Sequence, residues 1–208
     1  MTVVLLCGGE ISNYNFCKKY LNDYNYIICC DGGIRHAHKL ELTPDYIIGD
    51  MDSAEPELLA RYEKSIMLKY PKEKDHTDSA LGLDLAISLK ASYIVIMGGT
   101  GSRFDHSLAN VHLLFEALQK KVNAVLVDEC NAIRLVDSEI ELLGKEGATV
   151  SLISLTPQVE GITTEGLKYP LYGETLRFSS TRGVSNVMLG SRAKVTVQSG
   201  LLAVITLY

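Results

Sequence analysis

The sequence predicts an α/β protein in which an N-terminal three-layer α/β domain with a mainly parallel sheet precedes a C-terminal all-β sandwich domain. Up to about residue 127, short β-branched runs alternate with helix-like segments, which indicates an α/β layer fold. From about residue 130 onward the helical pattern stops, and turns that contain Gly, Pro and Ser separate short strand-like runs. No Gly/Pro-rich linker joins the two parts, so we expect two closely packed domains, residues 1–129 and 130–208.

The first domain contains six runs that we expect to be strands. Several are apolar on both faces, as central parallel strands are when helices cover both sides of a sheet. The runs are residues 3–6, 26–30, 46–48, 65–68, 93–97 and 124–127. Helices are expected between them, at residues 34–42, 55–64, 79–90 and 106–121.

The segment 106–121 has the clearest helical pattern. One apolar stripe runs along it, made of Leu108, Val111, Leu114, Phe115 and Leu118. Asp105 is its expected N-cap, because a carboxylate there accepts hydrogen bonds from unpaired backbone N–H groups. The leucines of residues 79–90 also alternate as in a strand, but length and Leu/Ala content favour a helix.

The second domain contains eight runs that we expect to be strands, because apolar and polar residues alternate in them. They are residues 133–136, 140–142, 149–155, 161–164, 175–178, 184–189, 193–198 and 201–207. Turns are expected between them, for example at residues 144–147, 169–173 and 189–191. Evenly spaced turns between short strands predict a sandwich or a barrel-like domain.

Composition excludes several classes of protein. The 208 residues carry 20 Lys+Arg against 25 Asp+Glu, a net charge of −5, which argues against a nucleic-acid partner. No apolar run approaches the ~20 residues that span a bilayer, and the first residues lack the positive segment of a signal peptide. We therefore expect no membrane partner. The five cysteines form no CxxC pair, and adjacent Cys29 and Cys30 suit a bridge poorly, so we expect a reduced, cytoplasmic protein.

Acidic side chains follow the ends of four predicted strands. In chain order they are Asp31, then Asp50 and Asp52, then Asp75 and Asp78, and finally Asp105 together with Arg103. The carboxyl ends of parallel strands share one edge of a sheet, so we expect these groups to meet in one crevice. Each aspartate by itself is equally compatible with a cap or turn role, and Asp52 with Glu55 has a capping-box spacing.

Together, however, these carboxylates would repel one another unless a cation lay among them. Mg²⁺, bound by a few carboxylates and by substrate phosphates, is the natural candidate. Asp50 and Asp52, two residues apart on a turn, are expected to point the same way and to hold one ion. The sequence therefore predicts a magnesium site at this edge of the sheet.

Glycine-rich turns follow two strands. Gly98, Gly99 and Gly101 lie between a predicted strand and a helix N-terminus, where backbone N–H groups and the helix dipole favour anions, and Gly8-Gly9 follows the first strand. Neither turn matches GxGxxG or the P-loop, so a plain tight turn is the alternative. Arg103 suits a phosphate, unless it only pairs with Asp105.

Other site chemistries lack their residue patterns. His36 and His38 diverge on a helix, and neither HExxH nor a cysteine spacing for zinc is present. There is no GxSxG elbow for a serine nucleophile, and the Cys29-Cys30 pair is interpreted as core.

With these residues assembled, the chain resembles the thiamine pyrophosphokinase (thiamine diphosphokinase) family. The resemblance runs from about residue 3 to the C-terminus, and GDxDS followed by DxTD and RxDH is a specific combination. The matching segments are Asp31-Gly32-Gly33, GDMDS at 49–53, KDHTD at 74–78, GGTGSRFDH at 98–106 with Leu108-Ala109-Asn110, GLKY at 166–169, and Ser185-Asn186.

The resemblance implies transfer of a diphosphate from ATP to the hydroxyl of thiamine, which gives thiamine diphosphate and AMP and needs Mg²⁺. It implies a nucleotide domain, a thiamine-binding β-sandwich domain, and a homodimer with active sites at the subunit interface. By match to the family motifs, the catalytic carboxylates are Asp50, Asp52, Asp75 and Asp78, with Asp50, Asp52 and Asp78 on the metal. The nucleotide-side residues are Asp31, Gly32, Gly98, Gly99, Gly101, Arg103, Asp105 and His106, and the thiamine-side residues are Lys74, Tyr169, Ser185 and Asn186.

The thiamine side departs from the family pattern at one position. Tyr169 stands where some relatives carry Trp, although tyrosine can also stack on a pyrimidine ring. The alternatives are an exposed turn residue for Tyr169 and structural hydrogen bonding for Ser185 and Asn186.

Two rival functions stay open on the sequence alone. One is a related diphosphokinase that acts on another hydroxymethyl heterocycle such as a pterin, and Tyr169, Ser185 and Asn186 argue against it. The other is a non-catalytic module that binds a nucleotide or thiamine. So many carboxylates near a triphosphate have little use in binding alone.

Overall fold

A computed structural model describes residues 1–52 and 56–208. Ser53 of the GDMDS segment and Glu55, with which the predicted helix 55–64 begins, lie outside the described residues. The chain divides into two compact units, Met1–Glu129 and Cys130–Tyr208.

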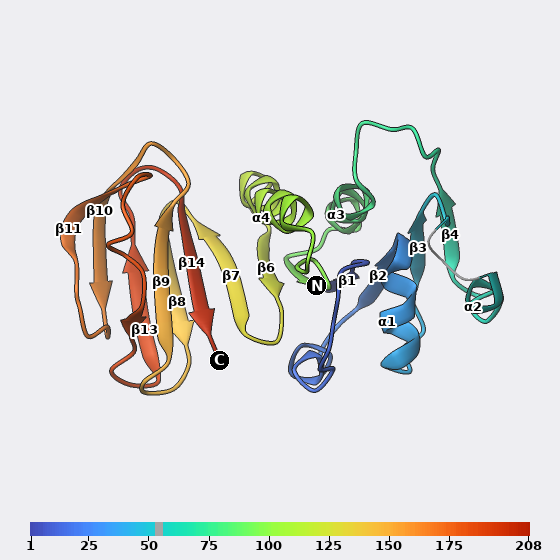
Figure 1. Cartoon of the computed structure of the whole chain (residues 1–208), viewed down its shortest axis with the longest axis horizontal. Coiled ribbons are helices and arrows are strands. Elements are labelled where there is room, and N and C mark those ends of the chain that lie inside the picture. The colour runs from blue at the N-terminus through green and yellow to red at the C-terminus, as the bar shows by residue number, and fades with distance from the viewer. Residues whose placement is uncertain (53–55) are drawn as a thin grey trace. The chain divides into compact units, whose positions relative to one another are not determined.

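The first unit is built on a parallel sheet (Figure 1). Its strands are β1 (Thr2–Leu6), β2 (Tyr26–Cys30), β3 (Tyr46–Gly49), β4 (Ile66–Lys69), β5 (Tyr93–Met97) and β6 (Asn123–Val127). They are hydrogen-bonded in the order β6-β5-β1-β2-β3-β4, and every pair is parallel. The last four residues of β1, β2 and β5 are buried, as expected for strands covered on both faces.

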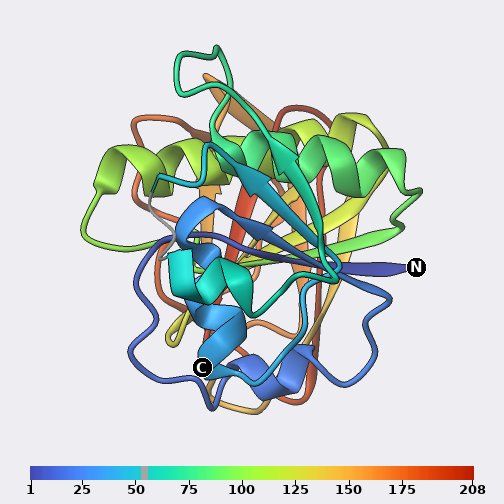
Figure 2. The same cartoon turned by 90° about the vertical axis from the view of Figure 1, so that its right-hand side faces the viewer.

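Helices cover both faces of this sheet, which makes the unit three-layered. Two helices, α3 (Asp78–Ser88) and α4 (Phe104–Gln119), lie on one face, and α1 (Ile34–Lys39) and α2 (Pro56–Ala60) lie on the other (Figure 2). The segment with the ambiguous leucine pattern is the helix α3, whose buried Leu83 and Ala86 face inward while Asp84 is exposed. The predicted α/β layer fold is therefore confirmed.

The predicted N-cap of α4 is wrong. The helix begins at Phe104, and Arg103 rather than Asp105 occupies the N-cap position without a capping side-chain bond. The reason is local, because the Asp105 carboxylate is taken by the guanidinium of Arg103, with Nε–Oδ1 at 3.0 Å and Nη2–Oδ2 at 2.6 Å.

The second unit is an antiparallel sandwich, as predicted. Its strands are β7 (Asn131–Val136), β8 (Glu139–Leu143), β9 (Thr149–Ser154), β10 (Gln158–Glu165), β11 (Tyr172–Arg177), β12 (Asn186–Val187), β13 (Arg192–Thr196) and β14 (Leu202–Leu207). They are hydrogen-bonded in the orders β12-β9-β14-β7 and β11-β10-β13-β8. Side chains from both layers form one buried core that includes Val150, Val159, Ile162, Val195 and Val204.

One predicted strand is much shorter than its sequence pattern. Residues 184–189 contain only the two-residue β12, because Ser185 has a φ of +63°, which extended backbone does not adopt. Val184 and Leu189 on either side are exposed. Within the described part of the chain, no helix has the length and apolar character needed to cross a bilayer.

Candidate active site

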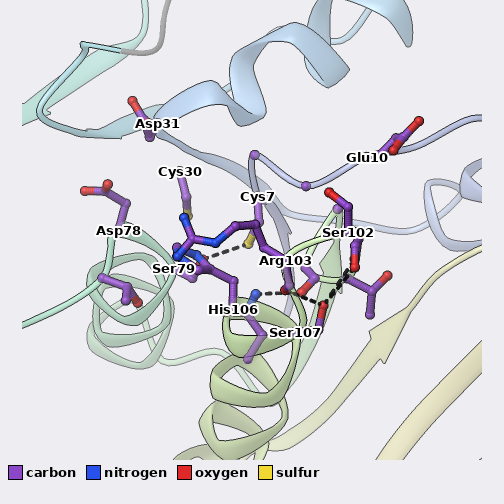
Figure 3. Close-up of a pocket in the computed structure, with 18 of the residues that line it drawn as sticks. Cys7, Glu10, Cys30, Asp31, Asp78, Ser79, Ser102, Arg103, His106 and Ser107 are labelled. Atoms are coloured by element: carbon purple, nitrogen blue, oxygen red, sulfur yellow. Dashed lines mark hydrogen bonds between the residues drawn. The ribbon is translucent and has the colours of Figure 1, made fainter.

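A cavity lies at the carboxyl ends of the strands of the first unit (Figure 3). The strand order reverses between β1 and β5, because the chain runs outward from β1 through β4 and then returns to the other side of β1. At such a switch point the loops that follow the two strands diverge and leave a crevice. The cavity has a volume of about 640 Å³, and the loops after β1 and β5 form part of its lining.

The glycines of these two loops allow their backbones to touch. Gly9 N–H donates to the carbonyl oxygen of Gly98 at 2.7 Å, and Asn110 Nδ2 on α4 donates to the carbonyl oxygen of Gly99 at 2.7 Å. A Cβ on Gly9 would overlap the carbonyl oxygens of Gly98 and Thr100. Gly98 has a φ of +63°, which favours glycine. The glycine turns are therefore required for two loops to pack against each other beside the cavity.

Side chains of helix α1 hydrogen-bond to the backbone of the loop after β1. Arg35 donates to the carbonyl oxygens of Gly8 and Gly9, and His36 Nε2 lies 2.7 Å from the carbonyl oxygen of Gly9. That carbonyl accepts only, so Nε2 carries the proton, and Nδ1 accepts from the Tyr14 hydroxyl at 2.7 Å. Burial lowers the pKa of His36 below the ordinary value of 6.5, with a smaller opposing effect from the Gly9 carbonyl.

The His36 linkage predicts a pH dependence of stability. Because the native pKa lies below 6.5, the unfolded chain binds more protons just below that pH, and the free energy of unfolding falls as the pH drops. The contribution of neutral His36 to the free energy of unfolding is fully present above about pH 6.5 and is lost as the pH falls toward the native pKa. We expect His36→Gln, which can still donate to the Gly9 carbonyl, to flatten the fall of the melting temperature between about pH 7 and pH 5.

The control is His38→Gln, on the exposed side of the same helix. An equal slope in native and His36→Gln proteins would contradict the linkage.

Three aspartates gather at one end of the cavity. Asp31, Asp50 and Asp78 line it, and Asp31 takes a φ of +47° directly after β2. A Cβ on Gly49 would lie 3.2 Å from both Asp31 Cβ and Asp78 Oδ1, so both side chains lie next to Gly49. Asp31 Oδ1 and Asp78 Oδ1 are both buried and make no hydrogen bond within the chain.

Asp78 is the aspartate whose charge the structure disfavours most clearly. Desolvation by burial raises its pKa, and Asp31 and Asp50 raise it further, while Lys74 opposes the shift. Lys74 Nζ lies 3.1 Å from Asp78 Oδ1, which is an ion-pair distance, but the atoms are not aligned as a hydrogen bond. The site thus contains carboxylates that lack their full complement of positive partners.

Predicted site residues divide into those that the structure brings to the cavity and those that it does not. The predicted residues that line it are Asp31, Asp50, Lys74, Asp78, Gly98, Gly99, Gly101, Arg103 and His106. Predicted residues of the first unit that do not line it are Gly32, Asp52, Asp75 and Asp105. Asp75 is exposed, and Gly32 is buried behind the loop after β1, where a Cβ added to Gly8 would lie 3.6 Å from the Gly32 Cα.

Of Asp50 and Asp52, which were expected to face one ion together, only Asp50 lines the cavity. Met51 between them has a φ of +65°, which turns the chain, and Asp52 N–H donates to Asp50 Oδ1 at 2.9 Å. Asp50 lines the cavity, whereas the Asp52 carboxylate pairs with Lys72 Nζ at 3.0 Å. Among residues 1–52 and 56–208, no three His, Cys, Asp or Glu side chains form a ready-made metal centre.

The predicted thiamine-side residues of the second unit surround one backbone segment. Asn186 is buried, its Nδ2 donates to the Tyr169 carbonyl at 2.7 Å, and its Oδ1 accepts from Tyr169 N–H at 3.0 Å. The Tyr169 ring is exposed, and Lys168 Nζ lies 5.6 Å from its centroid. Ser185 N–H donates to Ser151 Oγ at 3.1 Å. Asn186 therefore fixes the backbone that presents Tyr169.

Several cavity residues carried no clear signal in the sequence. They are Cys7, Glu10, Cys30, Arg35, Lys72 and Ser79. Cys30 is buried, as its core interpretation requires, but it also lines the cavity. A hydrogen bond from Cys30 lowers the pKa of the Cys7 thiol, against the effect of its burial. The position of Cys30 directly before Asp31 was the one available hint.

The cavity is lined by carboxylates and by positively charged side chains, and it lies beside glycine loops at a switch point. A phosphotransferase needs these features to hold a phosphorylated substrate. The fold and the site therefore define a phosphotransferase. Two family models match the chain: "Thiamin pyrophosphokinase, catalytic domain" over residues 17–126 and "Thiamin pyrophosphokinase, vitamin B1 binding domain" over residues 136–202. The chain belongs to the thiamine pyrophosphokinase family.

Individual relatives agree with this assignment. Thiamine pyrophosphokinase of Bacillus subtilis is 29% identical over 208 residues, which cover 98% of this chain and 97% of the relative. Thiamine pyrophosphokinase 2 of Oryza sativa is 31% identical over 83% of this chain and 73% of its own length. The crystal structure of the Bacillus subtilis enzyme matches with a TM-score of 0.90 at 27% identity, over 100% of this chain and 99% of that one.

The family predicted from the sequence is therefore confirmed, and neither rival function is favoured. The family's enzymes are ATP-dependent diphosphotransferases, and the chain is an enzyme of this class.

Proposed function

We propose that this chain transfers a diphosphate group from ATP to the hydroxyl of thiamine and releases thiamine diphosphate and AMP. The observation that carries the proposal is the cavity at the switch point, which is lined by glycine loops suited to phosphate and by Asp31 and Asp78, whose buried Oδ1 atoms accept no hydrogen bond. Membership of the thiamine pyrophosphokinase family supports the choice of ATP and thiamine as substrates.

Magnesium fits the carboxylates that the cavity contains. A buried carboxylate oxygen without a hydrogen-bond partner, as in Asp31 and Asp78, is a ligand ready for a hard cation. We propose that Asp50 and Asp78 hold Mg²⁺ together with Asp31, and that Asp52, held by Lys72 in this structure, is the further candidate ligand. When bound there, Mg²⁺ would neutralise negative charge on the phosphates of ATP.

The chain's own residues would then position the two substrates. Arg35, Arg103, Lys72 and Lys74 supply positive charge along the cavity, and the loops around Gly8 and Gly99 supply backbone N–H groups. Because AMP is the leaving group, the thiamine oxygen must attack the β-phosphorus of ATP. Phosphoryl transfers depend mainly on positioning and charge stabilisation, so this arrangement matters more than a dedicated general base. Asp75 is exposed and does not line the cavity, so we propose no catalytic role for it.

The second unit is the proposed thiamine-binding domain, as the first is the proposed catalytic domain. Tyr169 offers an exposed aromatic face for the pyrimidine ring, and Asn186 holds its backbone. Ser185 lies beside Asn186 in the strained position that precedes β12. We propose that Asn186 acts by positioning Tyr169.

The proposed assembly is a homodimer with active sites at the subunit interface, in the cytoplasm. Apolar side chains of Phe104, Leu108 and Phe115 are exposed along α4, and such a stripe suits a partner surface. The buried thiols of Cys7, Cys17 and Cys29 suit a reducing compartment. Sedimentation velocity of the purified chain tests the dimer, and a monomer at micromolar concentration would contradict it.

Product analysis tests the reaction directly. We expect the chain, incubated with ATP, Mg²⁺ and thiamine, to give equal amounts of AMP and thiamine diphosphate, resolved by chromatography with mass detection. ADP with thiamine monophosphate would mean an ordinary kinase and would overturn attack at the β-phosphorus. AMP formed only with a hydroxymethylpterin would favour the rival substrate, and calorimetric binding without any product would favour a binding module.

A further inference from the structure

The thiols of Cys7 and Cys30 form a pair in the wall of the cavity that the proposed reaction does not use. Cys7 directly follows β1, and Cys30 is the last residue of β2. These strands are parallel neighbours with Leu6 opposite Cys29, and Cys7 and Cys30 are the next residues along the two chains. Both cysteines line the cavity (Figure 3). The two residues are only 2% and 1% exposed.

The positions of Cys7 and Cys30 suit a disulfide bond. Neighbouring strands lie about 4.8 Å apart, which falls within the ~4.4–6.8 Å between the Cα atoms of disulfide-bonded cysteines. Both sulfur atoms lie against α3, because Ser79 Oγ donates to Cys7 Sγ at 3.3 Å and a Cβ added to Gly82 would overlap Cys30 Sγ. Ser79 and Gly82 are about one helical turn apart, so the two sulfur atoms lie on the same side of the sheet.

The other cysteines lack this arrangement. Cys29 is the neighbour of Cys30 on β2, so its side chain points to the opposite face of the sheet. Cys17 lies in the short 3₁₀ helix Cys17–Tyr20, and Cys130 is exposed in the second unit. Neither Cys17 nor Cys29 lines the cavity. Cys17 and Cys29 can therefore serve as controls for a reaction of Cys7 with Cys30.

We propose that Cys7 and Cys30 are a redox modification site, which hydrogen peroxide that enters through the substrate cavity converts to a disulfide. The Cys7 thiolate sulfur attacks one peroxide oxygen, the O–O bond breaks, and the hydroxide that leaves takes up the proton lost by Cys7, which gives Cys7 sulfenic acid and water. The Cys30 sulfur then attacks the Cys7 sulfur, and the sulfenic hydroxyl leaves as water with the Cys30 proton. Two thiols lose two electrons, and one peroxide becomes two waters.

The bond would connect two parts of the substrate cavity. Cys7 immediately precedes Gly8 of the loop after β1, and Cys30 immediately precedes Asp31. A disulfide removes the thiol that Ser79 contacts and ties the loop after β1 to the residue before Asp31. A misplacement of ~1 Å at a site can cost on the order of 100-fold in rate, so oxidation is expected to lower turnover by about tenfold or more.

Peptide mapping tests the disulfide independently of turnover. After alkylation and trypsin cleavage, Cys7 lies in peptide 1–18 and Cys30 in peptide 20–35. Peroxide treatment of the native chain should link these peptides with the loss of two hydrogen atoms, and dithiothreitol should separate them. Because Cys17 and Cys29 lie on the same two peptides, Cys17→Ser and Cys29→Ser are matched controls that should keep the link. Cys7→Ser and Cys30→Ser should each abolish it.

The second readout is AMP release, measured relative to each variant's own untreated rate. Peroxide should lower the native rate about tenfold or more, dithiothreitol should restore it, and ATP with Mg²⁺ should protect the thiols. Cys7→Ser and Cys30→Ser should keep their own rates. An unlinked native chain, or a 1–18 to 20–35 link that persists in Cys7→Ser or Cys30→Ser, would overturn the proposal. Since mapping needs no turnover, failure of the proposed diphosphate transfer is told apart from failure of this site.

Discussion

Asp78→Asn is expected to lower the rate of diphosphate transfer by on the order of 1,000-fold. The substitution removes a carboxylate whose buried Oδ1 has no hydrogen-bond partner and lies, like Asp31, next to Gly49. Without that negative charge the proposed magnesium site loses a ligand, and ATP loses part of what holds its phosphates. Initial rates of AMP release at saturating ATP, thiamine and Mg²⁺ measure the effect.

The fold should survive this substitution. Burial and the neighbouring carboxylates raise the pKa of Asp78, so its charged form is disfavoured in the native chain. A neutral amide relieves that repulsion, and without ligands we expect a melting temperature equal to or above the native one.

The matched control is Asp84→Asn, an exposed aspartate on the same helix. It should keep both the melting temperature and the rate within about twofold of native. If Asp78→Asn retains near-native turnover, the proposed role of Asp78 at the metal is wrong. If it unfolds instead, Asp78 is structural.

Gly9→Ala is expected to lower the free energy of unfolding by about 2–4 kcal/mol. A Cβ at this position would overlap the carbonyl oxygens of Gly98 and Thr100, which are backbone atoms and cannot rotate away. The loops after β1 and β5 would have to separate, and the hydrogen bond from Gly9 N–H to the Gly98 carbonyl would be lost. Urea unfolding followed by circular dichroism measures the change.

The neighbouring glycine supplies the comparison. A Cβ on Gly8 would meet its nearest neighbour, Gly32 Cα, at 3.6 Å, which is ordinary van der Waals contact. Gly8→Ala should therefore change the free energy of unfolding by less than about 1 kcal/mol. Equal effects of the two substitutions would mean that glycine is needed for chain flexibility there rather than for the close approach of the loops.

Local patterns in the sequence were enough to predict the layers of the fold. β2 and β5 occupy the predicted residues, because buried parallel strands read as continuous apolar runs whatever their neighbours are. The predicted element boundaries that were wrong depend on single residues and their contacts. α4 begins earlier than predicted because Arg103 takes the Asp105 carboxylate, and β12 is short because Ser185 adopts a positive φ.

The site, like the fold, was predicted from the sequence only in part. The strand-end rule brought Asp31, Asp50 and Asp78 to one cavity, since the carboxyl ends of parallel strands meet at one edge. It did not separate Asp50 from Asp52, because the direction of each side chain depends on the φ of Met51 and on the presence of Lys72, which is distant in the sequence. The anchoring of Gly9 by His36 and Tyr14 likewise joins three separate segments.

The sequence by itself thus determined the α/β and β-sandwich classes, the family and the loops on which the chemistry lies, because periodicity, glycine turns and motif order are local properties of the chain. Only the tertiary structure decided which carboxylates share the cavity, that Asn186 supports Tyr169, and that Cys7 and Cys30 both line the cavity. Those facts depend on strand register and on side-chain partners far apart in the chain, and packing alone sets both.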